Sequence, residues 1–331
     1  MTVNKPELIK AKILEPSDAL PLILLTIALL ALSLTAIFIK FSISQISANA
    51  TLFNRLWIAT IIFGLWSGVR QSRQRLSVTP VELPDIAKSR EILFLVILAT
   101  IHVLGRFFWT WSLTQTSAAN ATVLANSTPL FSTLGAWLFF QQRFNSKFLI
   151  GMAFAIVGAI ALAGEDLSAS TNSFIGDAAA LTSALFYAAS FLILEHLRTK
   201  LSVTAILVWR CLIGTLLMLP VVLIFEDQIL PISWSGWLAV IGLAAICEVL
   251  GHGLVVYSLK QFSAVFVTVF LLLEPVISAI LAWIIFSESL SILNLFGFGL
   301  IMEGIYLAKN GESAEKTASD SAMDESERLE A

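Results

Sequence analysis

The chain has 331 residues, of which 57% are hydrophobic and only 13% are charged, with a formal net charge of -3. An ordinary soluble domain carries about 25% charged residues, and a soluble core cannot hide so much apolar surface. The composition therefore excludes a soluble domain and favours a polytopic membrane protein. No basic patch points to nucleic acid. Cys211 and Cys247 lie in apolar segments and predict neither a disulfide framework nor a Cys-rich metal site.

Apolar runs long enough to span a bilayer, about 20 residues each, follow one another along the chain. They predict an all-α fold with ten transmembrane helices, at 20–40, 47–68, 91–113, 118–140, 146–164, 175–196, 203–225, 235–258, 263–286 and 291–308. Residues 1–19 lack the layout of a cleavable signal, so we expect a cytoplasmic N-terminal segment and a first helix that stays. Residues 309–331 are acidic and nearly free of aliphatic side chains, which predicts a disordered cytoplasmic tail.

The connections between the predicted helices alternate in charge. Basic residues follow the second, fourth, sixth and eighth helices, at Arg70, Arg73, Arg75, Lys88, Arg90, Arg143, Lys147, Arg198, Lys200 and Lys260. The other connections hold no Lys or Arg, and several carry carboxylates, as in the linker at 165–174. Because basic loops favour the cytoplasmic side, we expect both termini in the cytoplasm, the linker outside, and the protein in the cell (inner) membrane.

Two five-residue segments reveal an internal repeat: HVLGR at 102–106 and EVLGH at 248–252. Their offset, 248 minus 102, is 146, and it relates further pairs from the third helix through the fifth: Ser112/Ser258, Thr122/Thr268, Pro129/Pro275, Ser132/Ser278, Trp137/Trp283, Gly151/Gly297 and Gly158/Gly304. Upstream, Arg55 and Arg210 correspond at an offset of 155. The chain is therefore predicted to hold two five-helix repeats, at 20–164 and 175–308. Because five is odd, the second repeat enters the membrane from the opposite side, as in many secondary transporters.

The ionisable ends of both segments fall near the middle of the third and eighth helices. Residues four apart share one face of a helix. A charge at the bilayer centre costs about 2.5–3.5 kcal/mol on insertion scales. We therefore expect these two faces to turn inwards and to line a central path between the repeats.

Several stretches resemble EamA-type members of the drug/metabolite transporter superfamily. They are "TSAANATVLANSTPLFSTLGAWLFFQQRFNSKFLIGMAFAIVGAIAL", "FSAVFVTVFLLLEPVISAILAWIIFSESLSILNLFGFGLIMEGIYL", "NRLWIAT" and, from Gly176, "GDAAALTSALFYAASFLILEHL". The resemblance implies a ten-helix transporter of small organic metabolites. It also implies a central cavity lined by the first four helices of each repeat, with the fifth and tenth outside it. The first helix departs from the family, because "LSLTAIFIK" stands where a Trp-Gly pair is common.

The candidate cavity residues are polar, ionisable or aromatic: His102, Arg106, Trp109, Asn120, Asn126, Glu248, His252, Tyr257 and Glu274. Arg106 offers a planar fork of donors to a substrate carboxylate; the alternative is an internal ion pair with Glu248. Glu248 is a candidate acceptor for a substrate ammonium group or a proton, and the histidines are natural proton carriers. The alternative for all three is a satisfied buried network. Trp109 and Tyr257 are candidates for stacking on a substrate or for a place at the membrane interface.

Two prolines occupy equivalent places in the fourth and ninth helices. Pro129 and Pro275 each predict a helix kink with a freed backbone carbonyl, and matched interruptions point to a binding region. Glu274, beside Pro275, is either a cavity residue or a partner of Arg210 or Arg55. Those arginines lie nearer the helix ends, where Arg can reach towards the interface, so we predict a structural or gating role for them.

The leading hypothesis is a secondary transporter that exports a small polar metabolite, such as an amino acid, by alternating access. Three arginines and three glutamates within the spans sum to zero charge, which suits a zwitterion: Arg55, Arg106, Arg210, Glu248, Glu274 and Glu303. A channel or sensor is the alternative. An intramembrane metal enzyme is disfavoured, because the sequence holds no H-E-x-x-H motif.

We therefore expect no enzyme activity, no cofactor and no metal. The expected partners are a small-molecule substrate and the lipid bilayer, with a proton as candidate coupling ion. Glycines of the fifth and tenth helices allow close helix approach, either within the chain or in a homodimer. Glu303 belongs to the same peripheral helices, where packing or a subunit contact is expected.

Overall fold

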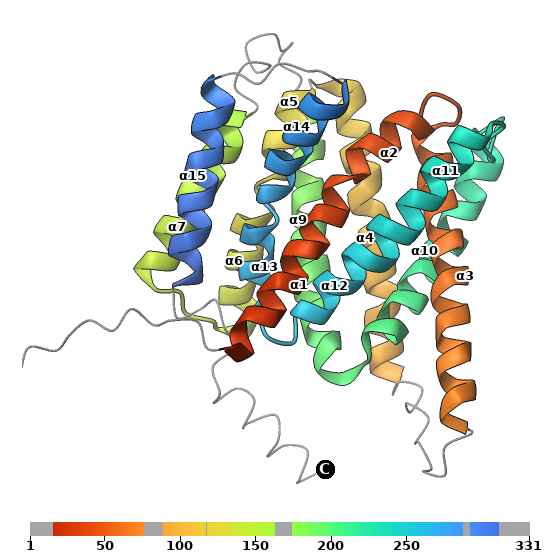
Figure 1. Ribbon diagram of the computed structural model, residues 1–331, viewed down its shortest axis with the longest axis horizontal. Helices are drawn as coiled ribbons and strands as arrows, with labels where there is room; N and C mark the ends of the chain where they lie inside the picture. Colours follow the sequence, from red (N-terminus) through yellow and green to blue (C-terminus); the bar gives the residue numbers. More distant parts are fainter. Residues whose placement is uncertain (1–15, 76–88, 117, 163–173, 287–291, 311–331) are drawn as a thin grey trace, which may run out of the picture.

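The computed structural model describes residues 16–75, 89–116, 118–162, 174–286 and 292–310. The predicted N-terminal segment up to residue 15, most of the linker at 165–174 and the predicted tail beyond residue 310 lie outside the described residues. The described elements, drawn in Figure 1, are all helical. They are α1 (Pro16–Ser33), α2 (Thr35–Ser42), α3 (Ala48–Arg75), α4 (Ser89–Gln115), α5 (Ala118–Ala125), α6 (Thr128–Phe140), α7 (Ser146–Leu162), α9 (Phe174–Lys200), α10 (Val203–Phe225), α11 (Trp234–Gly242), η1 (Leu243–His252), α12 (Gly253–Ser258), α13 (Ala264–Phe270), α14 (Leu273–Phe286) and α15 (Ile292–Lys309).

These helices supply the membrane spans that the sequence predicts. Within the described residues, nine helical segments are long and apolar enough to cross a bilayer, and Ser146–Ala161 is a shorter apolar helix. Some spans combine several elements, such as α1 with α2, or α11 with η1 and α12. The prediction of an all-α, multi-pass membrane fold is confirmed.

The interruptions of the fourth and ninth spans lie at the two equivalent prolines. α6 begins at Thr128 with Pro129 next in line, and α14 begins at Leu273, two residues before Pro275. Proline lacks a backbone N–H, and its ring clashes with the preceding turn of a helix. Each helix therefore restarts with its proline in the first turn, where the missing donor is tolerated.

On one side of the bundle, α7 and α15 pack against each other as an antiparallel pair (Figure 1). A Cβ added at Gly151 would lie 2.5 Å from the carbonyl oxygen of Gly304, and one at Gly158 would lie 2.7 Å from that of Gly297. Gly151 thus contacts Gly304, the repeat counterpart of Gly158, and Gly158 contacts Gly297, the repeat counterpart of Gly151. Only glycine permits this approach, and the exchange of partners shows that the equivalent helices run in opposite directions.

The inner helices repeat the same relation. Gly105 of α4 lies against Tyr187 of α9, whose ring would be 3.2 Å from an added Cβ, and its counterpart Gly251 lies against Leu32 of α1 at 3.0 Å. Leu32 and Tyr187 are 155 positions apart, the offset that relates Arg55 to Arg210. Two five-helix units of inverted direction therefore account for the packing of the bundle.

One segment departs from regular winding. Residues Leu243–His252 form a ten-residue π-helix, η1, between α11 and α12. Such turns are rare and occur frequently at functional sites. η1 carries the EVLGH segment, whereas HVLGR lies in the regular helix α4. The sequence contains no sign of this difference.

Candidate substrate-binding site

A buried cluster of three charges lies where α3, α10 and η1 meet. The Arg55 Nε atom donates to Glu248 Oε2 at 2.6 Å, and Arg210 Nη2 donates to the other oxygen of the same carboxylate. Arg55 is 3% exposed, and Arg210 and Glu248 are each 1% exposed. Charges so far from water persist only when they are paired and hydrogen-bonded. The two repeat-equivalent arginines thus converge on one carboxylate.

This cluster corrects two expectations from the sequence. Arg55 and Arg210 do not reach towards the interface, because their guanidinium groups are buried against Glu248. Glu248 therefore pairs with these two arginines and not with Arg106, as one predicted alternative had it. The described residues also show no pair between Glu274 and either Arg55 or Arg210, which was the other alternative. The fold decides which charged groups lie within hydrogen-bonding distance of one another. The spacing of these residues along the chain does not reveal those distances.

The ionisable faces of α4 and η1 do meet, as the internal repeat predicts. The rings of His102 and His252 pack edge to face with centroids 6.1 Å apart. His252 Nε2 lies 4.0 Å from Glu248 Oε2. The two histidines therefore connect the charge cluster to α4.

Arg106 lies on the same face of α4 as His102. Its Cζ atom is 5.9 Å from the centroid of the Tyr187 ring, close enough for a cation–π contact. Its Nε atom is buried and has no hydrogen-bond partner among the described residues. Tyr187 was missed from the sequence, although the glycine in the fourth position of each repeated segment signals a close neighbour at this level of the helix.

Unpartnered buried donors are a shared property of this region. Around the cluster, the described residues include three such donors, Arg55 Nη2, Arg106 Nε and Arg210 Nε, and His252 Nε2 is also buried without a hydrogen-bond partner. A buried donor without an acceptor costs about 1–3 kcal/mol. The cluster is therefore short of acceptors, and a ligand that carries acceptor oxygens would complete it.

Glu274 is half-buried at the start of α14, and its carboxylate has no hydrogen bond or ion pair within the described part of the chain. It lies within electrostatic reach of Arg106. Glu303, by contrast, is exposed on the peripheral helix α15. The zero charge balance expected from the sequence therefore changes. Without Glu303, three arginines face two glutamates, an excess of one positive charge.

The remaining predicted residues are partly exposed or not fully described. Trp109 and Asn126 are half-buried, and Tyr257 is 39% exposed. The side chain of Asn120 lies outside what the structure describes. Among the described residues, no group of three or more His, Cys, Asp or Glu side chains could hold a metal ion.

Among the described residues, the two ends of the bundle are packed to different extents. We call them the Lys260 end, where α12 turns into α13, and the Thr116 end, where α4 gives way to α5; they lie at the bottom and top of Figure 1. At the Lys260 end, all of α13 is buried, and Thr268 Oγ1 shares a 2.8 Å hydrogen bond with Ser132 Oγ of α6. At the Thr116 end, residues 122–128 are half-buried, and α5 lacks comparable packing against α14 in the described part of the chain.

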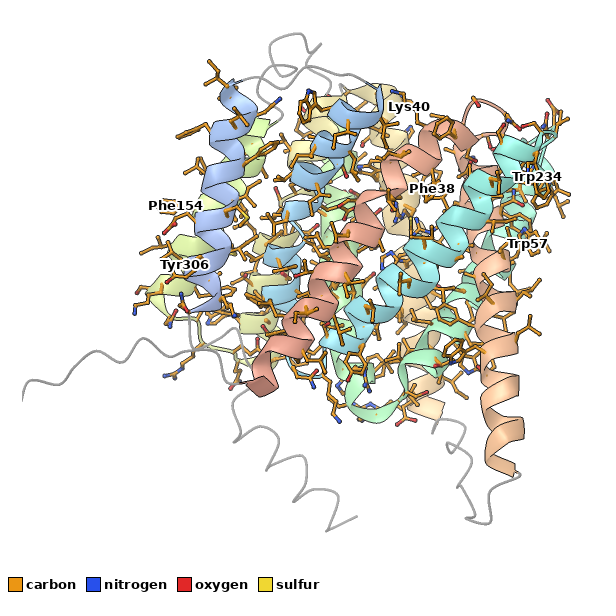
Figure 2. All side chains as sticks on the ribbon, viewed as in Figure 1. Phe38, Lys40, Trp57, Phe154, Trp234 and Tyr306 are labelled. Atoms are coloured by element: carbon orange, nitrogen blue, oxygen red, sulfur yellow. The ribbon has the colours of Figure 1, made fainter. Side chains whose placement is uncertain are left out.

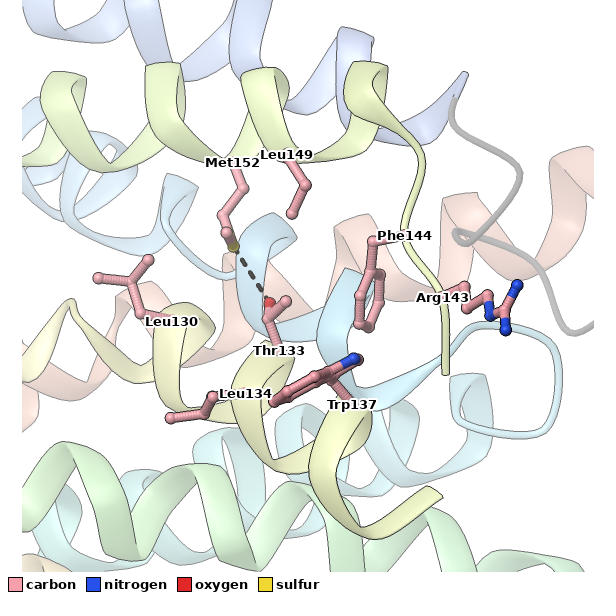
Figure 3. A pocket seen from close by; sticks show the side chains of 8 residues that line it. All are labelled: Leu130, Thr133, Leu134, Trp137, Arg143, Phe144, Leu149 and Met152. Atoms are coloured by element: carbon pink, nitrogen blue, oxygen red, sulfur yellow. Dashed lines mark hydrogen bonds between the residues drawn. The ribbon is translucent and has the colours of Figure 1, made fainter. Parts of the chain in front are cut away.

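A groove of about 620 Å³ lies between α6 and α7 (Figure 3). Its walls are mainly apolar and include Leu134, Trp137 and Met152, with the Thr133 hydroxyl bonded to the Met152 sulfur at 3.2 Å. None of the predicted cavity residues lines it. The groove is therefore separate from the candidate substrate site.

The profile of the EamA-like transporter family matches residues 19–164 and 174–309, one copy in each half of the chain. The chain belongs to the EamA-like transporter family. The drug/metabolite transporter resemblance expected from the sequence is thus confirmed. This EamA-like protein is an integral, multi-pass membrane protein.

Named relatives extend this finding. A "Probable amino-acid metabolite efflux pump" of Salmonella typhimurium is 28% identical over 195 residues, and the match covers 56% of this chain and 64% of that protein. A "Probable terminal-alkyne amino-acid exporter" of Streptantibioticus cattleyicolor is 26% identical over 261 residues, 77% of this chain and 81% of that protein. A solved structure described as "Crystal structure of protein" has the same fold, with a TM-score of 0.70 at 18% identity over 88% of this chain and 97% of that one.

Proposed function

We propose that this EamA-like transporter exports a small zwitterion of the amino-acid class, and that Arg106 binds the substrate carboxylate. The observation that carries the proposal is the buried Nε atom of Arg106, which has no acceptor among the described residues. Glu248 does not serve it, because Arg55 and Arg210 occupy both oxygens of that carboxylate. A substrate carboxylate would supply the acceptor that the site lacks, and bonds between ionised partners are the stronger ones.

Glu274 is the proposed partner of the substrate ammonium group. Its carboxylate makes no ion pair with another described residue and lies within electrostatic reach of Arg106. An arginine and a free carboxylate at one site match the opposite charges of a zwitterion. The relatives named as amino-acid exporters support the same substrate class and the outward direction.

Alternating access is the proposed mechanism, rather than a channel. A channel needs a path open at both ends, whereas here a hydrogen bond joins α6 to the buried helix α13 at the Lys260 end. Inverted repeats support exchange between two such states, because each repeat can adopt the packing of the other. In this proposal the protein lies in the inner membrane with both termini and the Lys260 end on the cytoplasmic side.

The coupling ion is proposed to be a proton carried by His102 and His252. Their rings are in contact, and His252 Nε2 is 4.0 Å from Glu248. A carboxylate bound at Arg106 would change the charge around both rings, which links the proton to the substrate. Replacing His252 with Gln is expected to flatten the dependence of flux on pH; an unaltered pH profile contradicts the assignment.

Flux of radiolabelled amino acids into vesicles that contain the purified protein tests the proposal. Arg106→Gln should lower the flux roughly 10- to 100-fold, the value of a hydrogen bond to a charged group. Glu274→Gln should lower the flux of amino acids but spare carboxylates that lack an ammonium group. Arg90→Gln is the matched control, since Arg90 is exposed at the start of the same helix. Parental flux in Arg106→Gln, or no flux of any amino acid in the parent, overturns the proposal.

A further inference from the structure

The charged side chains around the proposed substrate site carry an excess of positive charge. Arg55 and Arg210 share the single carboxylate of Glu248, which can neutralise only one of them. Arg106 and Glu274 lie within electrostatic reach of each other and offset one another. Among the described residues of this region, one positive charge is therefore left over, and a proton on a histidine would add to it.

A neutral zwitterion does not remove this excess. In the proposed binding mode, its carboxylate offsets Arg106 and its ammonium group offsets Glu274, so the occupied site keeps the net charge of the empty one. An amino acid with a second carboxylate carries one negative charge more than it carries positive charges. Its binding would bring the described charges of the site to neutrality.

The surroundings of the excess charge are apolar. Arg55 and Arg210 are 3% and 1% exposed. The peripheral helices turn apolar and aromatic side chains outward, among them Phe154 of α7 and Tyr306 of α15 (Figure 2). Water therefore screens the charge little. At an effective dielectric constant of about 20, a unit charge about 10 Å away changes an affinity roughly tenfold.

The two histidines connect the charge cluster to Arg106. His102 lies four residues before Arg106 on the same face of α4, and its ring contacts that of His252. His252 Nε2 in turn lies 4.0 Å from Glu248 Oε2. Arg106 and Arg210 are both within electrostatic reach of His102. A substrate held by Arg106 therefore lies in the positive potential of the cluster.

The free polar atoms of the cluster favour a carboxylate over an amide. Arg55 Nη2 and Arg210 Nε are buried donors that have no hydrogen-bond acceptor among the described residues. An ionised carboxylate carries acceptors only, whereas a side-chain amide brings two donors of its own. The region is thus suited to a second substrate carboxylate and less suited to an amide of the same shape.

We propose that the preferred substrate is an amino acid with an acidic side chain, which carries two carboxylates and one ammonium group. The inference rests on the proposed function and deepens it. Arg106 and Glu274 bind the groups that all amino acids share, and the positive potential of Arg55, Arg210 and Glu248 selects the second carboxylate. These three residues determine specificity through their summed charge.

Glutamate and glutamine test the proposal in the unaltered chain, because they have nearly the same shape and differ by one charge. In vesicles that contain the purified full-length protein, each competes with the flux of radiolabelled glutamate. Glutamate should reach half-inhibition at a concentration roughly tenfold lower than glutamine. Aspartate and asparagine form a second matched pair. No flux of glutamate, or equal or stronger competition by the amides, overturns the inference.

Arg210→Gln tests whether the cluster is the source of the selectivity. It removes one positive charge and leaves Glu248 paired with Arg55 at 2.6 Å, so the preference for glutamate over glutamine should fall roughly tenfold. Arg210→Lys keeps the charge and should keep the preference. The ratio of the two competitors is compared within each variant, so it does not depend on the yield of folded protein. A parental ratio in folded Arg210→Gln contradicts the assignment, and the competition in the unaltered chain decides the substrate class even where this variant fails to fold.

Failure of this inference differs from failure of the proposed function. Parental flux in Arg106→Gln would reject the amino-acid site itself. Lost flux in Arg106→Gln, together with equal competition by glutamate and glutamine in the parent, would leave that site in place and reject only the preference for an acidic side chain.

Discussion

The Lys260 end and the Thr116 end are built from equivalent residues, yet they pack differently. At the Lys260 end, Ser132 of α6 bonds Thr268 of α13 across the two repeats. The counterpart of Ser132 is Ser278, whose hydroxyl donates instead to the Ser33 carbonyl of α1 at 3.1 Å. This bond ties α14 to α1, which has no part in the Ser132–Thr268 bond. The comparison teaches that two similar repeats need not adopt the same packing, and a protein that alternates between two states requires this freedom.

The largest effect is expected from breaking the asymmetric charge cluster. Glu248→Leu leaves Arg55 and Arg210 buried without a carboxylate, which should destabilise the fold by about 3–5 kcal/mol. His102 is the repeat counterpart of Glu248 and forms no ion pair within the described residues. His102→Leu should therefore cost less, about 1–3 kcal/mol. Unfolding of the two variants in detergent measures the difference, and equal losses would show that the carboxylate is not the centre of the cluster.

The peripheral pair α7 and α15 provides a symmetric reference for this comparison. Gly158→Ala and Gly304→Ala each place a methyl group against the backbone of the partner helix, 2.7 and 2.5 Å from its nearest atom. Because these glycines are repeat counterparts, both variants should lose a similar 1–3 kcal/mol, roughly the cost of overpacking. Gly299→Ala is the control, since nothing lies within 4 Å of its added Cβ. Clearly unequal losses would contradict the two-fold symmetry of this pair.

The smallest effect is expected at the hydroxyl groups that distinguish the two ends. Ser132→Ala removes its bond to Thr268 and should favour opening of the Lys260 end by about 1 kcal/mol, roughly fivefold. Ser278→Ala removes the contact with Ser33 and should not increase the rate at which a membrane-impermeant maleimide labels a Val269→Cys reporter in the buried helix α13. Maleimide labelling rates of the two variants provide the test. A larger increase in Ser278→Ala than in Ser132→Ala would reverse the assignment of the closed end.

Much of the architecture is predictable because bilayer thickness imposes a common length on apolar helices. Alternating apolar runs and turns predict the spans, and the repeated HVLGR and EVLGH segments predict that His102 and His252 approach one another, as their ring contact shows. The π-helical winding of η1 and the contact of Tyr187 with Arg106 are absent from that prediction. The contact depends on the packing of α4 against α9, two helices that are distant along the chain.

By itself, the sequence determined the all-helical membrane fold and its two-fold repetition, because hydrophobic length and matched spacing are properties of the chain alone. It also placed His102, Arg106, Glu248 and His252 near the middle of two equivalent helices. Only the tertiary structure decided that Glu248 binds Arg55 and Arg210 and that Arg106 Nε keeps no partner. The physical reason is that several cations compete for few buried carboxylates, and distance in the folded bundle decides which pairs form.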